Sequence, residues 1–174
     1  MADTMAGLHR THYCGEVLNA GETVTVGGYV DTVRNKGGII FIVLRDRTGV
    51  VQLTFNETTD KAVFEKASSC HSEYVVMAKG EVRERESVND KIATGKVEIF
   101  VDDLRILAKA QTPPFEIVDN TNTNEELRLK YRYLDLRRKK LQDNIIKRSK
   151  IAKVARDYFA ENGFIEIETP MMIK

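Results

Sequence analysis

The order in which two hydrophobic periodicities follow one another constrains this fold more than any other feature of the sequence. Five stretches alternate between apolar and polar residues with a period of two, which is typical of β-strands. A single stretch, 59–69, has a helical period instead, with Val63, Ala67 and Cys70 on one face. It lies between the third and fourth of the strand-like stretches, which are 23–33, 39–44, 50–55, 74–86 and 96–107.

The connections between these stretches further limit the number of folds that the sequence can adopt. The short segment 46–49 between the second and third stretches predicts a hairpin. Three strands, one short helix and two more strands is the order of the OB-fold, a five-stranded Greek-key barrel. SH3-like barrels and small sandwiches have similar numbers of strands, but the position of the helix favours the OB-fold. We therefore predict a mainly β protein with a five-stranded barrel and a helix between strands 3 and 4.

A linker and a long helix follow the predicted barrel. Residues 111–124 include two consecutive prolines and the polar run VDNTNTN, and Asn124 can cap a helix. A longer helix with one apolar stripe is predicted over 137–162, and 164–168 alternates like a strand. One helix stripe and one strand without a partner cannot form a core alone. We therefore expect this chain to be the front portion of a longer protein, or part of an assembly.

Composition excludes several classes of protein. Charged residues make up 30% and hydrophobic residues 42% of the chain, which is a globular balance rather than a disordered one. No apolar run approaches the eighteen residues of a membrane span, and the first residues do not read as a secretory signal, so we expect no membrane association. Cys14 and Cys70 form no CxxC pair, which argues against a metal site and fits a cytoplasmic location.

Positive charge is concentrated in one segment although the net charge is only +1. Residues 128–156 hold twelve Lys or Arg against Asp135 and Asp143, a balance of +10. Such a segment is a candidate for contact with phosphate, and a solvated helix face explains it equally well. No glycine-rich phosphate loop, hydrolase motif or convincing carboxylate pair occurs, so we predict no catalytic residue and no metal ligand in this chain.

A barrel that binds single-stranded nucleic acid needs an aromatic platform and polar groups that reach base edges. Phe41 lies mid-strand, and alternation places it on the same face as Val43. Gln52 interrupts an apolar strand, and Glu98 could accept hydrogen bonds from a guanine edge. The alternatives are that Phe41 belongs to the core and that Gln52 and Glu98 are ordinary outward polar residues.

Two arginines near the end of the fourth stretch complete the candidate face. Arg83 and Arg85 share one side of the strand and could hold phosphates or stack on bases. The alternative is that they form surface ion pairs with Glu81 and Glu84, which contribute little energy.

Five motifs of this chain resemble motifs in the N-terminal part of the bacterial aspartyl-tRNA synthetases. They are RTHYCGE, GGIIFIVLRDRTGVVQ, TPPFEI, ELRLKYRYLDLRR and GFIEIETPMM. The related lysyl and asparaginyl enzymes share the barrel and a similar RYLDL segment, but not the second and third motifs together. A freestanding OB-fold RNA-binding protein that retained a synthetase barrel is a further alternative.

The resemblance implies a division into domains and a function. It implies an anticodon-binding OB domain over 1–108, a hinge over 109–137 and the truncated start of a class II catalytic domain over 138–174. That last part resembles motif 1, which builds a homodimer interface and ends here at Pro170. The whole enzyme would use ATP and magnesium to activate aspartate and transfer it to tRNA-Asp. The motifs that bind ATP lie downstream, so we expect this chain alone to be inactive and to bind no cofactor.

The resemblance also assigns roles to individual residues on the barrel. Phe41 matches the ring that stacks on the middle anticodon base, uracil, and Gln52 matches a base-reading amide. Glu98 matches the carboxylate that reads the first base, a guanine. The RNA-binding positions implied in full are Arg34, Phe41, Gln52, Arg83, Arg85, Asn89 and Glu98.

The chain departs from the family pattern near the first strand. Tyr29 replaces a tryptophan, and Thr32 and Val33 replace two of three arginines, leaving Arg34 as the last of them. Two fewer cations weaken the attraction for phosphate. Lys36 stands where the family varies with discrimination at the third anticodon base, so the choice between aspartate and asparagine tRNAs stays open.

Overall fold

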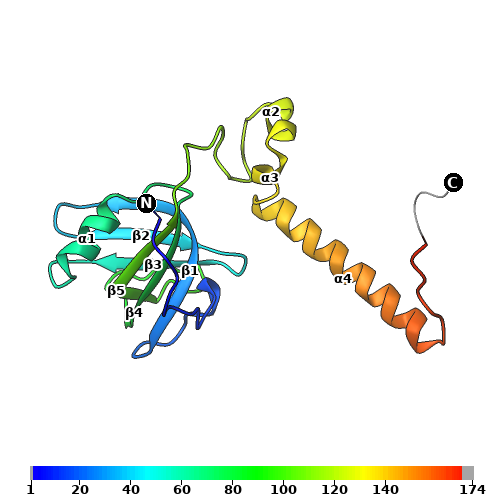
Figure 1. Cartoon of the computed structure of the whole chain (residues 1–174), viewed down its shortest axis with the longest axis horizontal. Helices are drawn as coiled ribbons and strands as arrows, with labels where there is room; N and C mark the ends of the chain where they lie inside the picture. Colours follow the sequence, from blue (N-terminus) through cyan, green and yellow to red (C-terminus); the bar gives the residue numbers. More distant parts are fainter. Residues whose placement is uncertain (1, 170–174) are drawn as a thin grey trace. The chain divides into compact units, whose positions relative to one another are not determined.

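The computed structural model describes residues 2–169 and divides the chain into two compact units, Met1–Pro113 and Pro114–Lys174 (Figure 1). Within the described residues the first unit contains five strands, the short 3-10 helix η1 (Cys14–Glu16) and one α-helix, and the second unit contains three α-helices.

The first unit is a closed five-stranded barrel with the strand order β1-β2-β3-β5-β4. All neighbouring strands are antiparallel except β3 and β5, which pair in parallel and close the barrel. This architecture confirms the predicted OB barrel. The strands are β1 (Thr23–Asn35), β2 (Ile40–Arg45), β3 (Val50–Phe55), β4 (Val75–Glu84) and β5 (Val97–Ala108).

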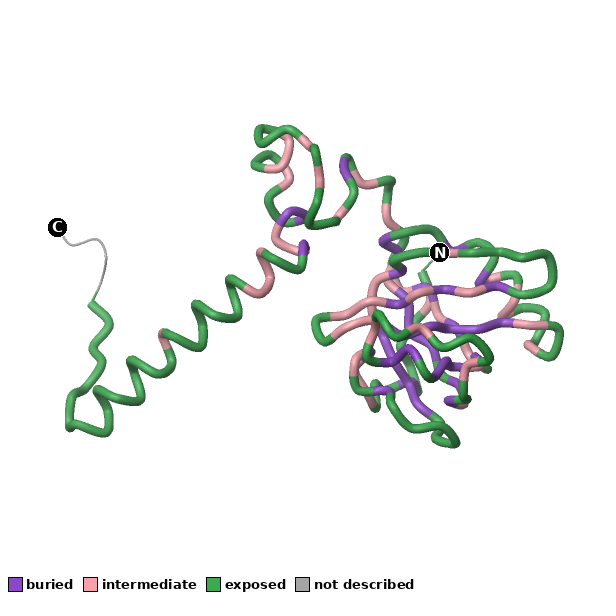
Figure 2. The backbone as a smooth tube through the Cα atoms, turned by 180° about the vertical axis from the view of Figure 1, so that it is seen from behind, coloured by how far each residue is buried: buried purple, intermediate pink, exposed green. Residues whose placement is uncertain are grey.

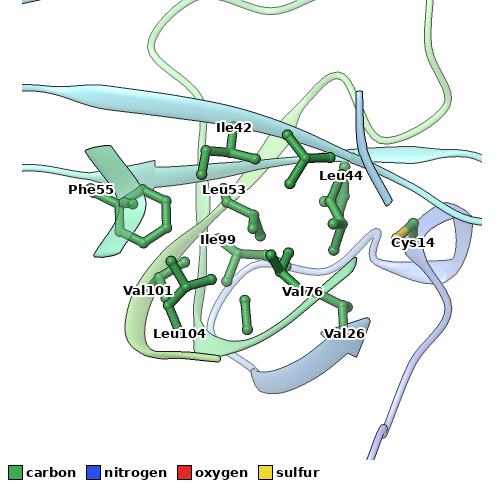
Figure 3. Packing of buried hydrophobic residues seen from close by; sticks show 14 of the residues in the cluster. Cys14, Val26, Ile42, Leu44, Leu53, Phe55, Val76, Ile99, Val101 and Leu104 are labelled. Atoms are coloured by element: carbon green, nitrogen blue, oxygen red, sulfur yellow. The ribbon is translucent and has the colours of Figure 1, made fainter. Parts of the chain in front are cut away.

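The core fills the inside of the barrel with the apolar side chains of alternate strand positions. On β2, Ile40, Ile42 and Leu44 are completely buried, whereas the intervening Phe41 and Val43 are only partly buried. Figure 3 shows side chains from several strands meeting around Leu53 and Ile99. Burial of these side chains is the main favourable contribution to barrel stability, because apolar surface is removed from water.

Helix α1 (Lys61–Ser68) lies between β3 and β4, as the change of hydrophobic period predicts. Asp60 caps it by accepting hydrogen bonds from the backbone N–H groups of Ala62 and Val63. Ala67 is its buried residue. Val63 and Phe64 pack against the core as well, so the helix covers the core with one face.

One glycine permits the close approach of β4 and β5 at a register shift. A Cβ at Gly80 would lie 2.0 Å from the carbonyl oxygen of Phe100, closer than atoms can approach. The pairing of β4 with β5 changes register between Lys79 and Gly80. At this shift the two backbones approach so closely along the curved barrel wall that only glycine, which has no side chain, fits at position 80.

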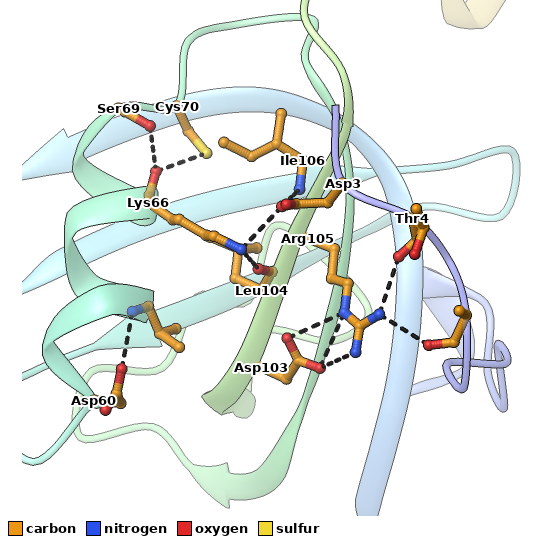
Figure 4. A network of polar contacts seen from close by, with 12 residues as sticks. Asp3, Thr4, Asp60, Lys66, Ser69, Cys70, Asp103, Leu104, Arg105 and Ile106 are labelled. Atoms are coloured by element: carbon orange, nitrogen blue, oxygen red, sulfur yellow. Dashed lines mark hydrogen bonds and ion pairs between the residues drawn. The ribbon is translucent and has the colours of Figure 1, made fainter. Parts of the chain in front are cut away.

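The first residues of the chain are fastened to the barrel by a polar network (Figure 4). An Asp3 carboxylate oxygen accepts hydrogen bonds from the backbone N–H of Ile106 at 2.9 Å and from Lys66 at 3.0 Å. Arg105 donates to the carbonyl oxygens of Thr4 and Ala6. The bond from Ile106, followed by that from Lys66, lowers the pKa of Asp3 below its ordinary value of 3.8.

We expect Asp3→Asn to lower the urea midpoint of unfolding at pH 6 but to have progressively less effect as the pH falls below 3.8. A carboxyl whose pKa is lower in the folded state stabilises that state above its unfolded pKa, and this contribution disappears as the folded-state pKa is passed. Exposed Asp102 supplies the control, Asp102→Asn. A deficit of Asp3→Asn that stays constant between pH 6 and pH 2.5, buffer values chosen to bracket this range, would contradict the assignment.

The second unit contains α2 (Glu125–Lys130), α3 (Arg132–Asp135) and α4 (Lys139–Glu161). Asn124 caps α2 by accepting a hydrogen bond from the backbone N–H of Glu126, as predicted. Gly163 follows α4 with a φ of +80°, a left-handed conformation that ends helices and favours glycine. The structure thus confirms a helix at both predicted places.

A buried carboxylate organises the two short helices. Asp135 is completely buried and lies 2.7 Å from Arg132, 3.4 Å from Arg138 and 3.8 Å from Arg128. Burying a carboxylate is costly unless cations compensate it, and these guanidinium groups do so. Part of the positive charge between 128 and 156 is therefore neutralised within the unit itself.

The expectation of a strand at 164–168 is wrong for the structure described. Residues 164–169 are neither strand nor helix. A strand needs a neighbour for its backbone hydrogen bonds, and the described part of the second unit contains none. Pro170 lies outside the described residues. Helix α4 is exposed along most of its length (Figure 2), including the apolar side chains of Ile145, Ile151, Val154, Tyr158 and Phe159.

Candidate nucleic-acid interface

The outer sides of β2, β3 and β5 form one continuous face because their side chains alternate with those of the core. Strand register places Phe41 of β2 beside Thr54 of β3, and Thr54 beside Phe100 of β5. Arg34 of β1 is the partner of Phe41 on the other side. The four side chains therefore form a row across the barrel wall, since directly paired positions point to the same face.

A second row lies two residues along the strands. Gln52 of β3 is the partner of Val43, and Glu98 of β5 is the partner of Arg83 on β4. We call the side chains of both rows on β2, β3 and β5 the outer face; these are Phe41, Val43, Gln52, Thr54, Glu98 and Phe100. Phe41 is therefore not a core residue, and alternation alone placed it correctly.

Gln52 and Glu98 are buried on this face rather than exposed. Their exposed fractions are 6% and 7%. The Gln52 amide nitrogen donates to Oε2 of Glu98 at 2.7 Å, and the Thr54 hydroxyl donates to the same oxygen. Gln52 and Glu98 thus point outward from the core, as the alternative had it, but they are buried partners in one hydrogen-bonded network rather than freely exposed polar residues.

Two arginines hold the other end of the Gln52 amide. Its Oε1 accepts from Arg85 at 3.1 Å and from Arg34 at 3.4 Å. A carboxylate can only accept and a guanidinium can only donate, so the amide must point its nitrogen to Glu98 and its oxygen to the arginines. Both lone pairs of Oε1 are then occupied, and one amide N–H remains for another partner.

Arg83 has a different environment from Arg85. It donates to Glu81 at 2.8 Å, and its guanidinium lies over the ring of Phe100, 4.5 Å from the ring centre. The structure therefore shows the surface ion pair with Glu81 that the sequence allowed, together with a cation–π contact. The outward side of the guanidinium stays accessible, since about half of the Arg83 side chain is exposed.

Asn89 shapes the loop between β4 and β5. Its backbone N–H donates to the Gly95 carbonyl at 2.9 Å, and its side-chain oxygen accepts from the Lys91 N–H at 3.2 Å. A Cβ at position 95 would lie 1.8 Å from the Asn89 carbonyl oxygen, so glycine is required there. The hydrogen bonds of Asn89 are made within its own loop, and none joins it to the Gln52 network.

The sequence interpretation missed two members of the outer face, Thr54 and Phe100. Each lies two residues after a candidate that was recognised, Thr54 after Gln52 and Phe100 after Glu98. The period of two along a strand was the available signal, because it assigns such residues to the same face.

The chemistry of this face suits a nucleobase more than a reaction. It combines a half-buried aromatic ring, a carboxylate, an amide N–H and three guanidinium groups. These are the groups that stack on bases, read their edges and attract phosphates. Among residues 2–169 no group of three or more His, Cys, Asp or Glu residues could hold a metal ion.

The two cysteine thiols are not suited to nucleophilic chemistry. Cys14 and Cys70 are unpaired and buried. Burial raises the pKa of Cys14 far above its ordinary value and that of Cys70 to about 11. Both side chains thus act as small core residues rather than as nucleophiles. No helix within the described residues has the length and apolar character needed to cross a membrane.

Comparison with known protein families agrees with this description of the two units. Residues 24–107 match the family model described as OB-fold nucleic acid binding domain, and residues 124–174 match tRNA synthetases class II (D, K and N). Two successive parts of the chain thus match an OB-fold nucleic-acid-binding domain and the class II tRNA synthetases.

Individual relatives define the family more narrowly. The whole chain is 53% identical to an aspartate–tRNA(Asp/Asn) ligase of Caldanaerobacter subterraneus subsp. tengcongensis and 52% identical to an aspartate–tRNA ligase of Ruminiclostridium cellulolyticum. It spans 30% of the length of each. A solved aspartyl-tRNA synthetase from Entamoeba histolytica superposes with a TM-score of 0.84 at 25% identity, over 96% of this chain and 40% of that one. Over its whole length the chain is thus homologous to the N-terminal part of the aspartate–tRNA ligases.

Proposed function

We propose that the barrel binds the anticodon loop of an aspartate-accepting tRNA as the recognition module of an aspartate–tRNA ligase. The observation that carries this proposal is the hydrogen-bonded chain from Arg34 and Arg85 through Gln52 to Glu98, beside the Phe41 ring. A buried, oriented set of donors and acceptors next to an aromatic platform is an arrangement that recognises a splayed base.

Each group on the outer face receives a role from its remaining hydrogen-bonding capacity. Phe41 stacks on the middle base, which we take to be uracil. Gln52 keeps one N–H and so donates to a carbonyl oxygen of that base. Glu98 accepts from the N–H groups of a guanine at the first position, because a carboxylate only accepts. Arg34, Arg83 and Arg85 attract the phosphates nearby, and Asn89 shapes the adjoining loop.

We assign aspartate activation to the part of the ligase outside this chain. ATP and magnesium would be required there, and the residues described here include no cluster suited to the metal.

We propose a homodimer for the whole enzyme, in which a second subunit covers apolar residues of α4 such as Val154 and Tyr158. We propose the cytoplasm as the location, where translation takes place and where unpaired cysteines such as Cys14 and Cys70 stay reduced.

Glu98→Gln tests the proposal at the first anticodon base. The wild-type chain is expected to bind a stem-loop with guanine there more tightly than one with adenine. The variant should lose about 10-fold or more of this preference, because a hydrogen bond to a charged group contributes about 1.5–3 kcal/mol.

The salt dependence of binding separates base reading from charge effects. Glu98→Gln should leave the slope of log Kd against log salt unchanged, since the carboxylate neutralises no phosphate. Fluorescence anisotropy with both stem-loops at several salt concentrations measures both quantities. A wild-type chain without any preference for guanine would contradict the proposed function.

A further inference from the structure

Thr54 occupies the centre of the outer face, between the two aromatic rings. It is 4% exposed, and its strand partners are Phe41 on β2 and Phe100 on β5. Its hydroxyl donates to Oε2 of Glu98, although the two residues are 44 positions apart in the chain. Threonine is stiff at χ1, so strand β3 fixes the direction of this hydroxyl.

The two oxygens of Glu98 are used differently. Oε2 accepts from both Gln52 and Thr54, which lie two residues apart on β3. Between residues 2 and 169, no side chain or backbone group donates a hydrogen bond to Oε1. In the same range, only Asp135 and Arg138 have a fully buried side-chain atom that lacks a hydrogen-bond partner. Oε1 of Glu98 also lacks such a partner but is not one of these atoms, so it is not fully buried and reaches the surface.

We propose that Thr54 is a positioning residue for base recognition, which fixes the Glu98 carboxylate so that Oε1 faces the RNA. This inference rests on the proposed function, in which Glu98 reads the first anticodon base. A glutamate has three rotatable bonds and by itself presents its oxygens in many directions. Two donors from one strand anchor a single oxygen and leave the other as the acceptor for a base.

Loss of the hydroxyl would affect recognition more than folding. Without the Thr54 hydroxyl, Gln52 is the only described residue that donates a hydrogen bond to the Glu98 carboxylate. The Gln52 amide also accepts hydrogen bonds from Arg34 and Arg85 through its oxygen. The carboxylate is then free to turn, and the preorganised acceptor for guanine is lost. A threonine that merely satisfied a buried carboxylate would change the stability of the barrel, with no selective effect on one base.

The test compares Thr54→Val, which removes the hydroxyl at similar size, with Thr54→Ser, which keeps it. Binding of the full chain is measured by anisotropy with stem-loops that carry guanine or adenine at the first anticodon position, at a temperature where circular dichroism shows each variant folded. Thr54→Val should reduce the preference for guanine about 3- to 10-fold, the worth of one hydrogen bond. Thr54→Ser should stay within about twofold of the wild type, since its hydroxyl can make the same bond.

Glu98→Gln, measured alongside, separates failure of this inference from failure of the proposed function. If Glu98→Gln loses the preference and Thr54→Val keeps it, Thr54 does not position Glu98, and the proposed function stands. If the wild-type chain shows no preference, both proposals fail. Should Thr54→Val not fold, Thr54→Ala removes the same hydroxyl without the branched methyl groups, and the same two outcomes apply to it.

Discussion

Phe41→Ala is expected to weaken binding of the aspartate-tRNA anticodon stem-loop about 5- to 150-fold. Stacking of one base on an aromatic side chain contributes about 1–3 kcal/mol, and the substitution removes the whole platform. Phe41 is half-buried and lies on the outer face between Arg34 and Thr54, so its ring has an open side for a base. Anisotropy titration of the full chain at constant salt measures the change.

Phe41→Tyr is the matched control, because it keeps an aromatic ring at the same place. We expect it to bind with nearly the affinity of the wild type. Equal affinity of Phe41→Ala and the wild-type chain would show that the ring is not a stacking platform.

Phe55→Ala is expected to destabilise the barrel by about 3–5 kcal/mol, the usual cost of truncating a buried phenylalanine. Phe55 is completely buried in the core that Figure 3 shows. The melting temperature of the barrel should fall by more than about 10 °C, since a domain of this size loses several degrees per kcal/mol. Thermal unfolding followed by circular dichroism measures the shift.

The two phenylalanine variants control for one another. Phe41 and Phe55 lie on adjacent strands but on opposite sides of the barrel wall. Phe41→Ala should therefore lose affinity with a smaller loss of melting temperature, and Phe55→Ala should lose stability while its folded fraction still binds. Equal losses of melting temperature in both variants would contradict the assignment of the two faces.

The barrel could be predicted because local patterns determine the order of its elements. Alternation located the strands, and the change of period at 59–69 located α1. Closure of the barrel through the parallel pairing of β3 with β5 has no local signal, because it joins segments distant in the chain. The fold family supplied that contact, through the rule that three strands, a helix and two strands form an OB barrel.

The composition of the outer face was predicted better than its burial. Alternation placed Phe41, Gln52 and Glu98 together, but it could not reveal that Gln52 and Glu98 are buried. Gln52 is contacted by Arg34 from β1 and by Arg85 from just beyond the end of β4, and both guanidinium groups reach its amide oxygen. A one-dimensional pattern assigns residues to a face, whereas coverage by long side chains is a property of the assembled barrel.

The second unit shows where local pattern is insufficient. Residues 164–168 alternate as a strand should, yet strand formation depends on a partner that the described residues do not contain. The apolar residues of α4 likewise have a helical period, and the helix forms, but most of them remain exposed. Periodicity predicts which face of an element is apolar, and other parts of a structure decide whether that face is covered.

The most direct test of the central claim compares two RNA stem-loops that share a stem and differ only in the three anticodon bases. The wild-type chain is titrated with each at the same salt concentration, so that phosphate contacts contribute equally. We predict that replacing the bases weakens binding by about 10-fold or more, because the ring of Phe41 and the carboxylate of Glu98 lose their partners. Equal dissociation constants for the two stem-loops would show that the barrel binds RNA only through its charge, and would contradict anticodon recognition.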